Sequence, residues 1–321
     1  MRGWIVSNGG LRQKKFTEQL DWMAHTLREA GVEAVQLCNQ ELTPAVLSGS
    51  PCILCNGHVY GTGYGTMRPD APWKPSGLEV GSLPDFVLFW DKDVRLAAHM
   101  EQAGFRLFNS ARTIADCDDK SATHRILSGH GIPMPDTLVA PFYYPGLVPE
   151  DDPFVRIAAE RLGYPMVVKE SYGSFGAQVY LAENAEMLST LHTRLAHVPH
   201  ICQRFVQSSR GRDVRLQVVG ERVVAAMFRH SETDFRANVS AGGSMDPFDP
   251  PESFSRLAVR ASQLLGADFA GVDLLFDEND GPLVCEVNSN AHMRNIHTCT
   301  GVDVPRQITE WILFRIGRKT E

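Results

Sequence analysis

Three residues with oxygen-bearing side chains stand close together near the C-terminal end of the sequence: Asp273, Glu286 and Asn288. Asp273 lies in an apolar run, and the other two end a second run that follows the turn-forming segment DENDGP. Strand residues two apart share a face, so Glu286 and Asn288 project together, and simple hairpin register brings Asp273 near them. Mg²⁺ prefers one or two carboxylates with phosphates and water. The pattern predicts a magnesium site; the alternative is ordinary edge residues with satisfied hydrogen bonds.

Composition sets the class of protein. The chain has 321 residues, of which 43% are hydrophobic and 21% charged, which is typical of a soluble protein with two or three domains. A net charge of -7 argues against nucleic-acid binding through a basic surface. No apolar run approaches the length of a membrane span, and the strand-like start predicts no signal peptide. Seven scattered cysteines predict reduced thiols in a cytoplasmic protein, and Cys52 and Cys55 lack the second pair of a zinc site.

Residues 1–112 alternate between short apolar runs and helical patterns, which predicts a parallel sheet with crossover helices. The expected strands are Trp4 to Ser7, Val32 to Leu37, Pro51 to Leu54, Phe86 to Trp90 and Phe105 to Phe108; the expected helices are Phe16 to Ala30 and Asp93 to Ala103. Residues 56–82 are rich in Gly and Pro, and a loop this long is functional or disordered. Its GTGYG lacks the helix that a phosphate loop needs.

The middle of the chain predicts helices from Lys120 to Ser128 and from Phe154 to Leu162. A strand ending in Lys169 is followed by a Ser/Gly loop, residues 171–177, and a second strand. Backbone N–H groups of such a loop can close over phosphates while Lys169 supplies charge. The alternative is a plain hairpin with a surface lysine.

The last third predicts alternating strands over 200–206, 213–219 and 223–229, a covering helix over 254–265 and a final helix over 305–315. Asp213 and Arg215 share a strand face. Arg236 and Asn238 lie in a polar loop, where an arginine can clamp phosphate or carboxylate or be simply solvated. We expect His292 and His297 to make loop contacts, since their spacing does not suit one helical face.

Several ordered blocks together resemble one family. They include GYPMVVKESYGSFGAQVYL, ICQRFVQSSRGRDVRLQVVG, DFRANVSAGG, and GVDLLF with LVCEVNSN, within residues 86–304. The set resembles the RimK-like branch of the ATP-grasp carboxylate–amine ligases. The resemblance implies an α/β (α+β) ATP-grasp fold, with an N-terminal α/β pre-ATP-grasp domain over 1–112. A lid subdomain over 113–199 and a C-terminal subdomain over 200–321 would then sandwich ATP.

The resemblance also implies roles for individual residues. Lys120 and Lys169 correspond to lysines on the ATP phosphates, with Ser174 in the loop that covers them. The adenine hinge would be Gln203, Arg204, Phe205 and Val206, with Asp213 at the ribose and Arg236 and Asn238 as a phosphate-side clamp. Arg215 would contact substrate, and Asp273, Glu286 and Asn288 would hold two Mg²⁺ ions, with Mn²⁺ as an alternative. Arg204 stands where an acidic residue is common, and SNAHMRN replaces the usual segment after Asn288, which puts glutamate as the added amino acid in doubt.

The implied reaction joins a carboxylate to an amine through an acyl phosphate and releases ADP and phosphate, with Lys169, Arg215 and Arg236 assisting the chemistry. The expected partners are ATP, a carboxylate and an amine borne by an amino acid, peptide or protein tail. The sequence does not determine the oligomeric state, and a homo-oligomer is one of the possibilities. Two alternatives remain: another ATP-grasp chemistry, such as a carboxylase or a thioester-forming ligase, and a nucleotide-binding regulatory protein without catalysis.

Overall fold

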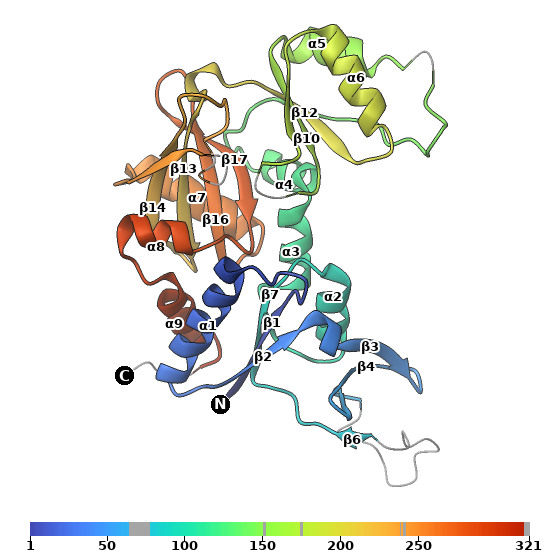
Figure 1. Cartoon of the computed structure of the whole chain (residues 1–321), viewed down its shortest axis with the longest axis vertical. Helices are drawn as coiled ribbons and strands as arrows, with labels where there is room; N and C mark the ends of the chain where they lie inside the picture. Colours follow the sequence, from blue (N-terminus) through green and yellow to red (C-terminus); the bar gives the residue numbers. More distant parts are fainter. Residues whose placement is uncertain (64–77, 150–151, 174–175, 238, 240–241, 318–321) are drawn as a thin grey trace.

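The computed structural model describes residues 1–63, 78–149, 152–173, 176–237, 239 and 242–317. Their strands form four sheets, three of which come from successive parts of the chain, while the remaining one, within residues 43–80, is inserted between the second and third strands of the first along the sequence (Figure 1). The mixed α/β class expected from the sequence is confirmed.

The first sheet is parallel, in the order β2-β1-β7-β8. Its strands are β1 (Arg2–Ser7), β2 (Glu33–Cys38), β7 (Phe86–Trp90) and β8 (Leu107–Phe108), joined by the crossover helices α1 (Lys14–Glu29) and α2 (Val94–Gln102). Ile5 packs with α1, whereas its neighbours Trp4 and Val6 pack with α2. Alternate residues of a strand face opposite sides, so the two helices cover opposite faces of the sheet.

The prediction that Pro51 to Leu54 joins this parallel sheet is wrong. The segment lies in β4 (Ser50–Cys55), which pairs antiparallel with β3 (Thr43–Leu47) and β5 (His58–Tyr60) in a separate sheet completed by β6 (Glu79–Val80). Ser48 and Gly49 have φ of 51° and 80°, the conformation of a two-residue hairpin turn, so the chain folds back after β3. A short 3₁₀ helix, Asn39–Glu41, precedes this hairpin. Of the Gly/Pro-rich loop, residues 64–77 lie outside the described residues.

Two consecutive helices, α3 (Ala111–Asp118) and α4 (Lys120–Ser128), lead to an antiparallel sheet of order β11-β10-β12-β9. Its strands are β9 (Thr137–Val139), β10 (Met166–Glu170), β11 (Val179–Ala182) and β12 (His200–Arg204), and α5 (Phe154–Leu162) and α6 (Ala185–Leu195) pack against it (Figure 1). Because β12 belongs to this sheet, we propose that the boundary between the second and third domains follows Arg204 rather than residue 199.

The fourth sheet is antiparallel, in the order β15-β14-β13-β16-β17. Its strands are β13 (Arg212–Val219), β14 (Arg222–His230), β15 (Ser244–Pro247), β16 (Phe269–Phe276) and β17 (Pro282–Asn288), and a 3₁₀ turn, Gln207–Ser209, precedes β13. Helix α7 (Glu252–Leu264) covers one face through an apolar core. The other face packs partly on α8 (Arg294–Thr300), α9 (Val304–Arg315) and α1, so the first and last parts of the chain share one core.

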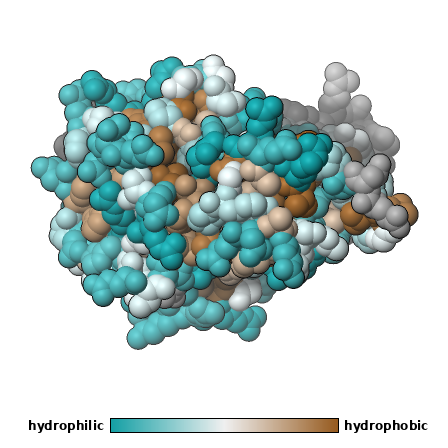
Figure 2. Space-filling model, turned by 90° about the horizontal axis from the view of Figure 1, so that it is seen from above, coloured by the Kyte–Doolittle hydropathy of each residue, from teal (hydrophilic) through white to brown (hydrophobic). Residues whose placement is uncertain are grey.

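The face of the molecule in Figure 2 is largely hydrophilic, with smaller groups of hydrophobic residues between. None of the helices in the described residues combines the length and apolar character that crossing a bilayer requires.

Candidate functional site

A cleft of about 750 Å³ collects side chains from three of the four sheets. Lys169 and Gln203 line it from the lid sheet (β9 to β12), and Arg215 and Asp273 line it from the C-terminal sheet (β13 to β17). The cleft also reaches residues that directly follow β1 and β7, which is the carboxyl edge where open α/β sheets bind ligands.

The predicted metal residues meet at one place in this cleft. Asp273 on β16 is the register partner of Glu286 on β17, as expected from the hairpin, and Asn288 lies two residues further along β17. A register shift after Asp273 inserts Cys285 into β17, and all four residues line the cleft. Asn288 Nδ2 is buried without a hydrogen-bond partner among the described residues. The set offers two carboxylates and an amide on one surface, which fits the ligand preference of Mg²⁺.

Asp273 is already engaged by arginines. Arg215 donates from Nε and Nη2 to its two oxygens, each at 2.6 Å, and Arg229 Nη2 lies 3.1 Å from Oδ2. Burial acts to raise the pKa of Asp273, but the charges of Arg215 and Arg229 outweigh it and bring the pKa down to about 2. A cation that binds Asp273 would therefore meet an ionised carboxylate but would have to compete with Arg215.

Arg229 continues this chain of charges to Asp213. Its Nε and Nη2 donate to the two oxygens of Asp213 at 2.6 and 2.8 Å. Burial raises the pKa of Asp213 in spite of this arginine. Sequence reasoning missed Arg229, although it sits directly across from Asp213 in the β13–β14 register and an antiparallel pairing would have identified it.

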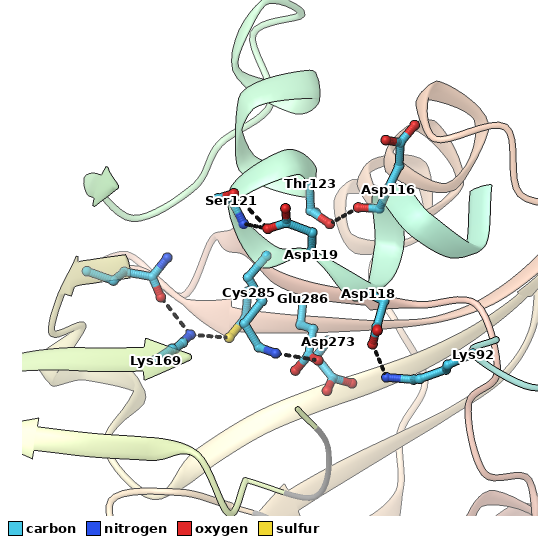
Figure 3. A network of polar contacts seen from close by, with 12 residues as sticks. Lys92, Asp116, Asp118, Asp119, Ser121, Thr123, Lys169, Asp273, Cys285 and Glu286 are labelled. Atoms are coloured by element: carbon cyan, nitrogen blue, oxygen red, sulfur yellow. Dashed lines mark hydrogen bonds and ion pairs between the residues drawn. The ribbon is translucent and has the colours of Figure 1, made fainter. Parts of the chain in front are cut away.

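The two predicted phosphate lysines, Lys120 and Lys169, also line the cleft. Figure 3 shows Lys169 beside Cys285 and Glu286. Lys120 begins α4, whose first turn is capped by the Asp119 carboxylate, and its Nζ lies 3.7 Å from Glu286 Oε1. Lys169 Nζ donates to Gln203 Oε1 at 2.7 Å and lies 3.5 Å from Cys285 Sγ. Both lysines are more than nine-tenths buried, so each is a desolvated cation facing an anionic or polar partner across the cleft.

The helix that carries Lys120 is held in place by further contacts in Figure 3. Thr123 Oγ1 donates to the Asp116 carbonyl at 2.7 Å, and Lys92 pairs with Asp118 at the end of α3. The first contact fixes α4 against α3 and the second holds α3 to the segment after β7, so together they set the direction from which Lys120 enters the cleft.

His124, one turn after Lys120, was not expected to matter. Its Nε2 accepts a hydrogen bond from Gln203 Nε2 at 3.1 Å. Burial, followed by the charges of Lys169 and Lys120, lowers the pKa of His124 to about 4, so the ring is neutral at pH 7 and can act as this acceptor.

The four expected hinge residues, Gln203 to Val206, all line the cleft. The side chain of Gln203 is turned inward to Lys169 and His124, whereas Arg204 pairs with Asp136 outside, at 2.8 Å. The outward direction of Arg204 explains why a basic residue is accommodated at this position.

Arg236 connects two loops at the cleft. It forms an ion pair with Asp234 at 2.7 Å and donates from Nη1 to the Gly176 carbonyl, also at 2.7 Å. Gly176 belongs to the Ser/Gly loop after Lys169, so this contact joins that loop to the C-terminal sheet's side of the cleft. Ser174 and Asn238, predicted in the same two loops, lie outside the described residues.

The two histidines near the C-terminus differ. His292 lines the cleft, and burial lowers its pKa. His297 was expected in a loop but lies in α8, where its Nδ1 is 3.0 Å from the Val302 carbonyl and its ring packs on Trp22. His297 is therefore a packing residue.

Comparison with known proteins places the chain. The RimK-like ATP-grasp domain matches residues 117–312. Human N-acetylaspartylglutamate synthase A is 38% identical over 226 residues, which is 70% of this chain and 56% of that protein. Zebrafish (Danio rerio) beta-citrylglutamate synthase B is 38% identical over 239 residues, 71% of this chain and 56% of that protein. The chain thus spans about half the length of the curated relatives it matches.

A solved structure agrees at the level of the fold. The ATP-grasp ligase PsnB, in complex with a minimal precursor, Mg and ADP, superposes with a TM-score of 0.66 at 17% identity, covering 98% of each chain. The expected ATP-grasp architecture is confirmed, and the chain belongs to the RimK-like ATP-grasp family.

Proposed function

We propose that this chain is an ATP-dependent carboxylate–amine ligase, which forms an amide through an acyl phosphate and releases ADP and phosphate. One observation carries the proposal: a single cleft holds two buried lysines and, facing them, two carboxylates and an amide on one β-hairpin. Buried like this, the lysines suit phosphate groups and the oxygen donors suit a divalent cation.

ATP would lie between the lid sheet and the C-terminal sheet. Its phosphates would meet Lys120 and Lys169, and the backbone of Gln203 to Val206 would border the base. Asp213 is the proposed ribose contact, which its position in the cleft supports. Arg236, with Ser174 and Asn238 as further proposed contacts, would draw the Ser/Gly loop over the phosphates through the carbonyl of Gly176.

Asp273, Glu286 and Asn288 would hold Mg²⁺, as two ions, with Mn²⁺ as an alternative. PsnB, which has this fold, was solved with Mg and ADP, which supports the assignment. Magnesium held by these residues would supply positive charge against the charge that develops on the transferred phosphate.

The residues of the chain position the reaction. Arg215 would bind the carboxylate, and later the acyl phosphate, with the same fork of donors that it now gives to Asp273. Lys169 and Arg236 would stabilise negative charge on the transferred phosphate. Closure of the Ser/Gly loop would keep water from the acyl phosphate.

The relatives' names support an amino acid as the amine, since both describe synthases whose products contain glutamate. We propose an amino acid as the amine and an acid, peptide or protein tail as the carboxylate. The seven cysteines, all free thiols, support a cytoplasmic location.

The test is ADP release in the presence of Mg²⁺ and ATP, with N-acetylaspartate or citrate as the acid and each amino acid in turn as the amine. Mass spectrometry should show an amide in any reaction that releases ADP. ADP formation that needs coenzyme A or bicarbonate but no amine would instead identify another ATP-grasp chemistry, and ATP binding without turnover over the whole screen would identify a regulatory protein.

A further inference from the structure

Asp91 is a buried carboxylate in the cleft that the reaction outlined above does not use. It directly follows β7, at the carboxyl edge of the parallel sheet, and is 8% exposed. Its oxygens accept from its neighbour's backbone, Lys92 N at 2.7 Å, and lie 3.4 Å from Asn8 Nδ2. None of the described residues forms an ion pair with Asp91, so this carboxylate is buried without a cation.

A second unused acceptor lies beside it. Asn290 Nδ2 donates to the Asp91 backbone carbonyl at 2.7 Å, which fixes the orientation of the amide. Asn290 Oδ1 is then left buried, without a partner among the described residues. Both residues line the cleft, so a carboxylate and an amide oxygen are available at one place for a group that only donates hydrogen bonds.

A short series of contacts links Asp91 and Asn290 to the predicted metal ligand Asp273. Arg215 binds Asp273, and its side chain also packs at the backbone of Gly271, where a Cβ would lie 3.7 Å from Arg215 Cδ and 2.3 Å from Ala291 Cβ. Ala291 is the neighbour of Asn290, whose amide holds Asp91. Asp91 thus lies where the end of the parallel sheet meets the loop after β17, which contains Asn290 and Ala291.

We propose that Asp91 binds the ammonium group of the amine substrate, with Asn290 Oδ1 as a second acceptor. The inference rests on the proposed ligase function and gives it a substrate class: an amine that is a cation at neutral pH, such as an amino acid. An ammonium group has three donors and no acceptor, and the carboxylate of Asp91 with Oδ1 of Asn290 offers acceptors for it. Arg294, which pairs with Glu18, also lines the cleft and offers a cation to the carboxylate of a zwitterion.

The alternative is a purely structural role, in which Asp91 stabilises the turn after β7 by accepting the hydrogen bond from Lys92 N. That role needs an acceptor for Lys92 N, which the oxygen of asparagine supplies equally well. Burial raises the pKa of Asp91, which means that folding does not stabilise its charge, so the neutral variant should keep the fold. Asp91→Asn therefore separates the charge from the structural role.

The experiment compares a charged amine with a neutral one. Hydroxylamine is uncharged at pH 7.5 and traps acyl phosphates as hydroxamates. With N-acetylaspartate or citrate as the acid, Asp91→Asn should form hydroxamate at the wild-type rate, with an unchanged KM for ATP. The KM for glutamate, or for whichever amino acid the wild type uses, should rise on the order of 10- to 100-fold, as expected for the loss of one charge-assisted hydrogen bond.

Asp21→Asn is the matched control, because Asp21 is an exposed carboxylate on α1 that pairs only with Gln36 among the described residues. An unchanged amine KM in Asp91→Asn overturns the proposal. A parallel loss of hydroxamate also overturns it, since the carboxylate would then act before the amine enters. Asn290→Ala tests the second acceptor and should raise the KM for the amine without changing hydroxamate formation. No hydroxamate and no ADP from the wild type with any acid would refute the ligase function itself.

Discussion

Replacing Arg215 with methionine should destabilise the free protein more than the protein loaded with magnesium and nucleotide. In the free protein, Arg215 supplies both of the 2.6 Å hydrogen bonds that pair it with Asp273, a carboxylate that is 5% exposed. The substitution keeps most of the length of the side chain but removes the charge. Asp273 is then left with Arg229, 3.1 Å away, as its remaining ion-pair partner among the described residues.

Breaking a buried ion pair from one side costs roughly 3–5 kcal/mol, and the remaining contact with Arg229 favours the lower end, about 3 kcal/mol. An unfolding entropy of about 2 cal/mol/K per residue then gives a drop in Tm of roughly 4 °C for a chain of this length. With Mg²⁺ and a non-hydrolysable ATP analogue bound, the metal takes over the charge of Asp273. The loss should fall to about 1 kcal/mol, a drop in Tm of roughly 1–2 °C.

Thermal unfolding of wild type and Arg215→Met, each with and without saturating Mg²⁺ and analogue, measures both losses. Arg222→Met is the control, because Arg222 is an exposed arginine of the same sheet, paired with Gln307. Equal destabilisation of Arg215→Met in both states would refute the reasoning, since Asp273 would then gain nothing from the metal.

Two further outcomes are expected. Lys169→Met should weaken binding of the ATP analogue roughly 30-fold by calorimetry, because it removes a buried cation at the phosphates. Lys14→Met, at an exposed position that begins α1, should leave the affinity unchanged, and equal affinities of the two variants would remove Lys169 from the nucleotide site. His124 has a folded pKa of about 4, below its usual 6.5, so the folded state binds fewer protons and stability should fall by up to about 3 kcal/mol as the pH drops from 6.5 to 4. In His124→Gln, which keeps an acceptor for Gln203, chemical denaturation should show a smaller fall over the same range; an unchanged pH profile would contradict the lowered pKa.

The elements whose apolar pattern is long or alternating could be predicted from the sequence. The strand from Phe269 to Phe276 and the helices from Lys120 to Ser128 and Phe154 to Leu162 have the predicted bounds. Pairing was harder to predict, because a short apolar run such as Pro51 to Leu54 fits a parallel or an antiparallel sheet equally well. The turn at Ser48 and Gly49 decides it, and its positive φ angles are not evident from that residue pair alone.

The residues of the candidate site also fall into two groups, those predictable from local sequence and those brought together only by the tertiary fold. Asp273, Glu286 and Asn288 could be found because a hairpin fixes their neighbours from local sequence. The contact between Arg229 and Asp273 could not, since Arg229 lies on β14, which is separated from β16 by β13. Asp91 and Asn290 are about 200 residues apart, and only the packing of the first sheet against the loop after β17 brings them together.

The central claim is that the β16–β17 hairpin holds magnesium for ATP-dependent chemistry. ADP release by Glu286→Gln, measured beside Glu278→Gln in the exposed turn of the same hairpin, tests it most directly. We predict that Glu286→Gln loses ADP release by at least about 100-fold while keeping its fold, and that Glu278→Gln matches the wild type. ADP release by Glu286→Gln at the rate of Glu278→Gln would contradict the assignment of the metal site.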